Sequence, residues 1–140
     1  LQKKLAAAVN VFTGFPGEKY PHLLVIFVVP NPDVALDVLE KEVLEELDSI
    51  RKDGVRPDEL ERFKAQALHD FYKTFEDNGH LARELTFYEK VAGSWRKLFE
   101  TPRQIRAVTA ADVQRVVQTY CVPERRIVGT IQPPAKKDGE

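Results

Sequence analysis

The run Leu23-Leu24-Val25-Ile26-Phe27-Val28-Val29 constrains the fold most tightly, because seven consecutive apolar residues leave no polar face for solvent. Its β-branched and aromatic side chains favour a strand. A strand that is apolar on both faces is normally covered on both sides. We therefore predict a central strand with Ile26 and Phe27 buried on opposite faces. The run is far too short to cross a bilayer, which takes about 20 apolar residues in a helix.

A second strand is predicted immediately before this run. Between Ala6 and Phe15, the apolar residues Val9, Val11 and Phe15 fall at alternating positions, as in a strand with one buried face. The segment from Phe15 to Pro21 contains Pro16 and Gly17 and is predicted to be a turn. Because the connection is short, the two strands should form an antiparallel hairpin.

A helix should follow the hairpin, with Asn31 as its cap and Pro32 at its first position. Its apolar residues recur every three or four positions and form one stripe: Leu36, Leu39, Val43, Leu47 and Ile50. Most of its acidic residues lie off this stripe, so we interpret them as a solvated face. Gly54 is placed to end the helix in a left-handed conformation.

Helical patterns occupy most of the remaining chain. One helix is predicted to start at Pro57, and a second covers 81–91 after a break at 77–79. Further helices are predicted over 94–99, from Thr101 onward, and over 109–120. Thr109 should cap the last of these, with Asp112 reaching back in a capping box. A final strand is predicted over 126–132. The order of elements predicts an α+β fold with helices packed on one face of an antiparallel sheet.

The composition fits one globular domain with its own core, since 43% of the 140 residues are hydrophobic and 31% are charged. We expect a single domain over 1–134 and a disordered tail over 135–140. A formal net charge of −1 gives no indication of nucleic-acid binding or of an anionic membrane as partner. The chain contains no Met and begins within a pattern, so we expect it to be a piece of a longer protein.

Metal-binding chemistry is not predicted from the three histidines, His22, His69 and His80. His69 and His80 would share a face only on an unbroken helix, with Glu76 nearby, and would still lie too far apart to hold one ion. His80 and Glu84 are four residues apart, which is typical of a surface pair.

Nucleophilic and phosphate-binding chemistry is not predicted either. Cys121 has no neighbouring His and is interpreted as a small buried residue at a helix end. Ser49 and Ser94 lack a glycine elbow, and the seven glycines form no phosphate loop. Five arginines are interpreted as helix-end and surface charges: Arg103, Arg106, Arg115, Arg125 and Arg126. Six aromatic residues are predicted to pack in the core or between helices: Phe63, Phe71, Phe75, Phe87, Tyr88 and Trp95. We therefore predict no catalytic, cofactor-binding or metal-binding residue in this chain.

The order of two motifs nevertheless resembles a known family. Gly54-Val55-Arg56-Pro57-Asp58-Glu59-Leu60-Glu61-Arg62-Phe63-Lys64 precedes a long helical stretch, and Val108-Thr109-Ala110-Ala111-Asp112-Val113-Gln114-Arg115-Val116 precedes a short strand ending in proline. This order resembles the pitrilysin/insulinase-type zinc peptidases, which include mitochondrial processing peptidase. The resemblance runs from about Leu1 to Pro133.

The resemblance implies a role without catalysis. The family's active units carry an H-x-x-E-H zinc motif, which this sequence lacks. Such units occur in pairs that enclose a peptide substrate, and often only one unit holds zinc. This chain is similar to the C-terminal part of a non-catalytic unit, whose further strands would precede Leu1. In many such units an Arg and a Tyr contact the substrate, but the Arg position falls before Leu1 and Ala7 stands at the Tyr position.

The expected function is therefore a non-catalytic domain of a zinc metalloendopeptidase, with structural and substrate-enclosing roles. The expected partners are a second, zinc-bearing peptidase-like unit and a peptide substrate, without membrane insertion. Two alternatives stay open. The chain could be a structural scaffold like the core subunits of respiratory complexes, or the back half of the zinc-bearing unit itself. The resemblance favours a periplasmic or secreted bacterial parent, with a mitochondrial one as the other option.

Overall fold

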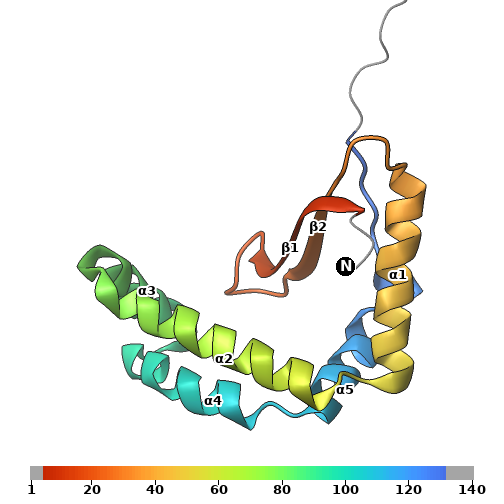
Figure 1. Ribbon diagram of the computed structural model, residues 1–140. Helices are drawn as coiled ribbons and strands as arrows, with labels where there is room; N and C mark the ends of the chain where they lie inside the picture. The colour runs from red at the N-terminus through yellow and green to blue at the C-terminus, as the bar shows by residue number, and fades with distance from the viewer. Residues whose placement is uncertain (1–4, 132–140) are drawn as a thin grey trace, which may run out of the picture.

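A computed structural model describes residues 5–131 of the chain (Figure 1). The strands β1 (Ala6–Phe15) and β2 (Leu23–Pro30) form a two-stranded antiparallel sheet. Asn10 pairs with Phe27 and Val11 with Ile26. The α+β class, the antiparallel sheet and the hairpin are thus confirmed, with both strands at nearly the predicted positions.

Between the hairpin and residue 131, where the described part ends, the chain forms five α-helices and three short 3-10 helices. Their bounds are α1 (Leu36–Asp53), α2 (Pro57–Lys73), η1 (Thr74–Glu76), α3 (Asn78–Ala92), η2 (Trp95–Glu100), α4 (Thr101–Ala107), α5 (Ala110–Tyr120) and η3 (Pro123–Arg125). The predicted start at Pro57 is confirmed. The helix also breaks where predicted, but at Asp77 alone, so that α3 starts at Asn78 and not at Leu81. Local capping chemistry explains this success, since proline suits a first turn and Asp77 accepts the backbone N–H of His80.

The predicted start of the first helix is wrong. The carbonyl of Asn31 accepts the amide of Val34 at 3.2 Å, and Asp33 has a φ of 69°. This turn displaces the start of α1 to Leu36, with Ala35 at the cap position. Gly54 does follow the last turn with a positive φ of 76°, although its ψ of −162° is not that of the left-handed helix.

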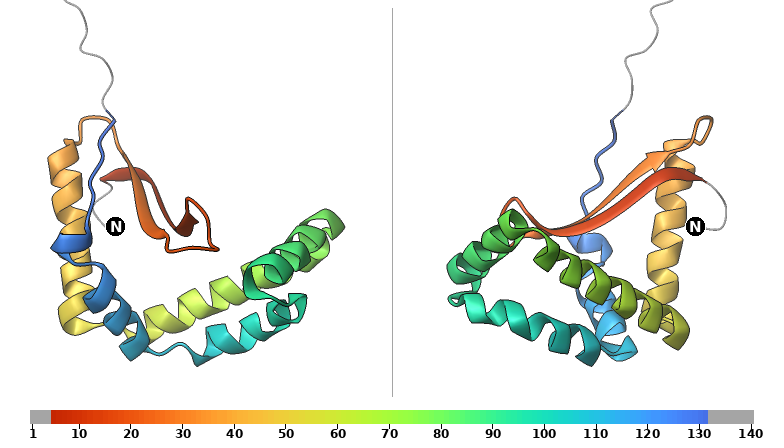
Figure 2. Two further views of the ribbon diagram at one scale, coloured as in Figure 1. Left: turned by 180° about the vertical axis from the view of Figure 1, so that it is seen from behind. Right: turned by 60° about the vertical axis from the view of Figure 1, so that its left-hand side comes forward.

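The helices form two packing groups that meet at an angle (Figures 1 and 2). One group pairs α1 with α5, whereas the other joins α2, α3, α4 and η2 in a layer. The hairpin lies on the inner side of the angle between α1 and this layer. Two short segments, 54–56 and 108–109, connect the groups along the chain.

The core is small for a chain of this size. Among the described residues, the buried apolar side chains are Leu39 in α1, Leu98 in η2 and Val117 in α5. The chain exposes 11378 Å² of surface, against about 7,400 Å² expected of a compact 16.0 kDa protein. The apolar content of the sequence is therefore largely at the surface.

The predicted burial of β2 is wrong. Phe27 is 50% exposed and Ile26 is only half-buried. Eight large apolar side chains of the hairpin are exposed: Val9, Val11, Phe12, Phe15, Leu23, Leu24, Phe27 and Val29. They project from both strands, and the described residues provide no layer that covers them.

The third predicted strand is also absent from the described residues. Residues 126–131 form no strand, and Ile127 is 88% exposed. No backbone hydrogen bond joins this part to β1 or β2 among the described residues, so it lacks the ladder that defines a strand. Gln132 and the predicted tail over 135–140 lie outside the described residues. Within the described part, no helix has the length and apolar character needed to cross a membrane.

Candidate functional site

The three histidines lie apart from one another. His22 contacts the carbonyl of Tyr20, with its Nδ1 at 3.1 Å. His69 belongs to α2 and His80 to α3, and the turn between these helices removes the continuous face on which the two could align. His80 and Glu84 form the exposed pair that their spacing predicted, with Nε2 and Oε1 3.9 Å apart. Within residues 5–131, no three His, Cys, Asp or Glu side chains gather closely enough to hold a metal ion.

Cys121 directly follows α5 and is half-buried. Burial raises the pKa of its thiol above the ordinary value of 9.0, and the nearby charge of Arg51 offsets only part of this effect. A raised pKa keeps the thiol protonated and therefore a poor nucleophile at neutral pH. Its position fits the predicted structural role at a helix end.

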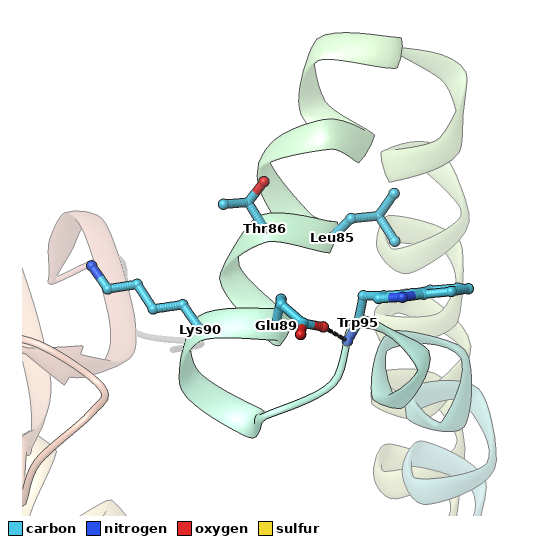
Figure 3. A pocket seen from close by; sticks show the side chains of 5 residues that line it. All are labelled: Leu85, Thr86, Glu89, Lys90 and Trp95. Carbon is cyan, nitrogen blue, oxygen red and sulfur yellow. Dashed lines mark hydrogen bonds between the residues drawn. The ribbon is translucent and has the colours of Figure 1, made fainter.

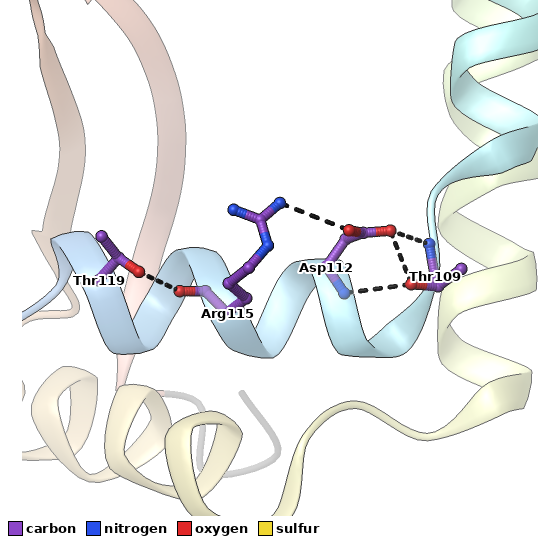
Figure 4. A network of polar contacts seen from close by, with 4 residues as sticks. All are labelled: Thr109, Asp112, Arg115 and Thr119. Atoms are coloured by element: carbon purple, nitrogen blue, oxygen red, sulfur yellow. Dashed lines mark hydrogen bonds and ion pairs between the residues drawn. The ribbon is translucent and has the colours of Figure 1, made fainter.

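Thr109 and Asp112 form the predicted capping box at the start of α5 (Figure 4). The Thr109 hydroxyl accepts the amide of Asp112 at 3.2 Å, and the Asp112 carboxylate accepts the Thr109 amide at 3.0 Å. Hydrogen bonds from the hydroxyl and the amide of Thr109, followed by that from Arg115, hold the pKa of Asp112 below 3.8. Both partners are used in capping the first turn of the helix, so this motif is structural.

A second polar cluster joins α1 to α5. The guanidinium of Arg51 donates to the carbonyl of Cys121. In return, Gln114 and Gln118 each donate to the carbonyl of Arg51 at 3.1 Å, and Gln114 also reaches that of Lys52 at 3.2 Å. The sequence analysis missed this cluster. The four-residue spacing of the two glutamines was its one local signal.

Two adjoining depressions of the surface lie on α3. The larger depression, of about 530 Å³, is open and shallow and is lined by Leu85, Thr86, Glu89, Lys90 and Trp95. Figure 3 shows Leu85 and Trp95 on one side, Thr86 and Lys90 on the other, and Glu89 between them. An adjoining depression of about 400 Å³ shares Thr86 and Lys90 and adds Ala82, Arg83 and Phe87. We call these two depressions the α3 surface.

The prediction that all six aromatic residues pack inside is wrong for three of them. Trp95 and Phe87, which line the α3 surface, are 40% and 37% exposed, and Phe63 on α2 is 66% exposed. Phe71 and Phe75 pack edge to face, with ring centres 5.1 Å apart, as expected. Helical spacing marks a side chain as part of a stripe, but it does not reveal whether another layer covers that stripe.

Comparison with known proteins places the fold among proteases. No protein-family profile matches the chain, and no curated protein matches it in sequence. A protein from Bordetella pertussis Tohama I that is assigned as a zinc protease superposes with a TM-score of 0.77 and 26% identity over 94% of this chain and 71% of its own. The inactive peptidase domain of another assigned zinc protease, from Bordetella parapertussis, gives 0.71 and 25% over the same shares.

A protease from Helicobacter pylori is similar in fold, with a TM-score of 0.72 and 20% identity. The match covers 86% of this chain but only 29% of the Helicobacter chain. The chain thus has the fold of zinc-protease peptidase domains, and one of these domains is inactive.

Proposed function

We propose that this chain is a non-catalytic peptidase-like domain of a zinc metalloendopeptidase of the pitrilysin/insulinase type. It serves structural and substrate-enclosing roles, while a second peptidase-like unit carries the zinc. The observation that carries the proposal is the similarity to the inactive peptidase domain from Bordetella parapertussis, which extends over 94% of this chain.

The chemistry of the chain supports a role without zinc. The sequence has no H-x-x-E-H motif, whose two histidines and glutamate would bind the metal and activate water. Ala7, at the position of the family's substrate-contacting Tyr, is an exposed residue of β1 without a hydrogen-bonding side chain. The chain's own residues therefore do not fit a catalytic zinc, and no reaction step is assigned to them.

The exposed apolar surface supports a role as part of an assembly. Apolar patches beyond a few hundred Å² are rare on monomers and mark interaction sites. Here the hairpin presents apolar side chains from both strands, among them Phe12 and Phe27. A second unit, or further strands of the same unit, would remove this surface from water.

The test starts by identifying a peptidase-like unit with an H-x-x-E-H motif in the parent protein or a neighbouring gene, and by reconstituting it with this chain. We expect one zinc per complex, none on this chain alone, and chelator-sensitive cleavage of a quenched fluorescent peptide that requires both partners. Full cleavage without this chain would instead support the scaffold alternative. Zinc bound stoichiometrically by this chain alone, with cleavage, would overturn the proposal.

A further inference from the structure

We propose that the α3 surface binds an extended acidic segment of the peptide substrate, with an aromatic residue of that peptide seated beside Trp95. The proposal rests on the substrate-enclosing function above and names the chemistry of its ligand. It is argued from the charges, the exposed apolar side chains and the spacing of the surface.

The surface carries two exposed cations, Arg83 and Lys90, that have no ion-pair partner among the described residues. The neighbouring carboxylates of Glu84 and Glu89 keep their charge, but each contacts a group other than Arg83 or Lys90. Glu84 lies 3.9 Å from His80, and Glu89 accepts the amide of Trp95 at 2.8 Å. A ligand with carboxylates would therefore gain charge-assisted hydrogen bonds here.

The apolar part of the surface adjoins these cations. Trp95 and Leu85 form one wall of the larger depression, and Phe87 lines the adjoining one. An exposed indole beside a basic side chain is typical of binding surfaces, where aromatic side chains supply most of the contact area. The guanidinium of Arg96 lies 4.5 Å from the centre of the indole ring and helps to hold it in place.

The spacing selects the form of the ligand. Arg83 and Lys90 are seven residues apart on α3, which places their Cα atoms about 10.5 Å apart along the helix axis. An extended peptide advances about 3.3 Å per residue and its side chains alternate between two sides. Carboxylates four residues apart therefore lie on one side, about 13 Å apart, within reach of these two long basic side chains. A bulky side chain two residues after the second carboxylate would lie on the same side of the peptide as that carboxylate, towards Trp95.

The experiment uses the full chain and an acetylated, amidated peptide containing Glu-Ala-Ala-Ala-Glu-Ala-Phe, whose two glutamates and phenylalanine share one side when the peptide is extended. Trp95 is the single tryptophan of the sequence, so its fluorescence reports directly on this surface. We expect a saturable change in its emission, weakened by salt. Replacing both peptide glutamates by Gln should weaken binding about fivefold, because each exposed ion pair contributes about 0.5 kcal/mol.

Variants of the chain locate the site. The double variant Arg83→Gln, Lys90→Gln should bind the acidic peptide about fivefold more weakly than the parent chain does. Its affinity for the Gln peptide should equal that of the parent chain. Lys41→Gln, on the exposed side of α1, is the matched control and should bind as the parent does. Circular dichroism checks that each variant folds. Equal affinity of the parent chain for both peptides, or unchanged affinity of the double variant for the acidic peptide, would overturn the proposal. A Trp95 fluorescence that neither peptide changes would also overturn it.

The proposed function and the proposed peptide binding at the α3 surface can be contradicted independently of each other. Loss of this binding would leave the zinc content and the partner dependence of the reconstituted protease as tests of the assembly alone. Peptide binding by a chain that joins no protease would support the α3 surface while overturning the proposed function.

Discussion

Arg51 and Cys121 lie 70 residues apart in sequence, yet the guanidinium of one donates a hydrogen bond to the backbone carbonyl of the other. Gln114 and Gln118 complete the contact by donating to the carbonyl of Arg51. The last carbonyls of a helix have no partner within the helix. Side chains of α5 thus cap the C-terminal end of α1 and hold the two helices together.

The first prediction concerns these two glutamines. Because both donate to one carbonyl, either Gln114→Ala or Gln118→Ala alone should cost about 0.5 kcal/mol, whereas the double variant should cost about 2 kcal/mol. Urea unfolding of the single and double variants measures the coupling. Gln66→Ala is the control, since within residues 5–131 Gln66 bonds only to Asp70 on its own exposed helix face. Strictly additive losses would contradict the shared acceptor.

The second prediction concerns the start of α5. Thr109→Ala removes the acceptor for the Asp112 amide and should lower the free energy of unfolding by roughly 0.5–2 kcal/mol. Thr119→Ala is the matched control. Its hydroxyl bonds to the carbonyl of Arg115 within the helix, so its loss should change stability little. In the reconstituted protease, Thr109→Ala should leave peptide turnover unchanged at a permissive temperature. Normal stability with lost turnover would instead assign Thr109 a role in catalysis.

The third prediction is a pH dependence at the same position. The pKa of Asp112 is depressed in the folded chain, so its contribution to stability is present above the unfolded value of about 3.9. That contribution is lost as the pH falls through the depressed pKa. The stability difference between the parent chain and Asp112→Asn should therefore be full at pH 6 and shrink below about pH 4. Chemical denaturation at several pH values measures it, and a difference independent of pH would refute the assignment.

Capping residues account for most of what the sequence predicted correctly. Asp77 and Thr109 act through hydrogen bonds to their own neighbours in the chain, and Pro57 acts through its fixed φ. Local sequence therefore suffices to place these helix starts. The burial of Phe27 could not be predicted in this way, because burial depends on which other layer covers a strand. The same holds for the bond between Arg51 and Cys121, which only the folded chain brings together.

The α3 surface eluded prediction for a related reason. Trp95 and Phe87 have the spacing of buried residues, and their exposure follows from the open arrangement of the helices. Arg83 and Lys90 were indistinguishable in sequence from other surface charges. What singles them out is the absence of an ion pair among the described residues together with their position beside the exposed rings.

The fourth prediction contrasts the core with the hairpin. Leu98 is 1% exposed, so Leu98→Ala should cost about 2–5 kcal/mol. Phe27→Ala removes a larger side chain, yet it should cost under about 1 kcal/mol in the isolated chain because half of that side chain is already in water. Thermal or urea unfolding compares the two. If a partner covers the hairpin, Phe27→Ala should destabilise the reconstituted assembly more than Leu98→Ala does.

The contact between Arg51 and Cys121 also bears on how such a domain can change in length over evolution. It closes a loop that contains the whole layer of α2, α3 and α4. The entropy lost on closing a loop grows slowly, by about 0.6 kcal/mol for each doubling of its length. Insertions at the turns of that layer would therefore lengthen the loop at little thermodynamic cost, leaving α1 and α5 as the fixed frame around a segment that is free to diversify.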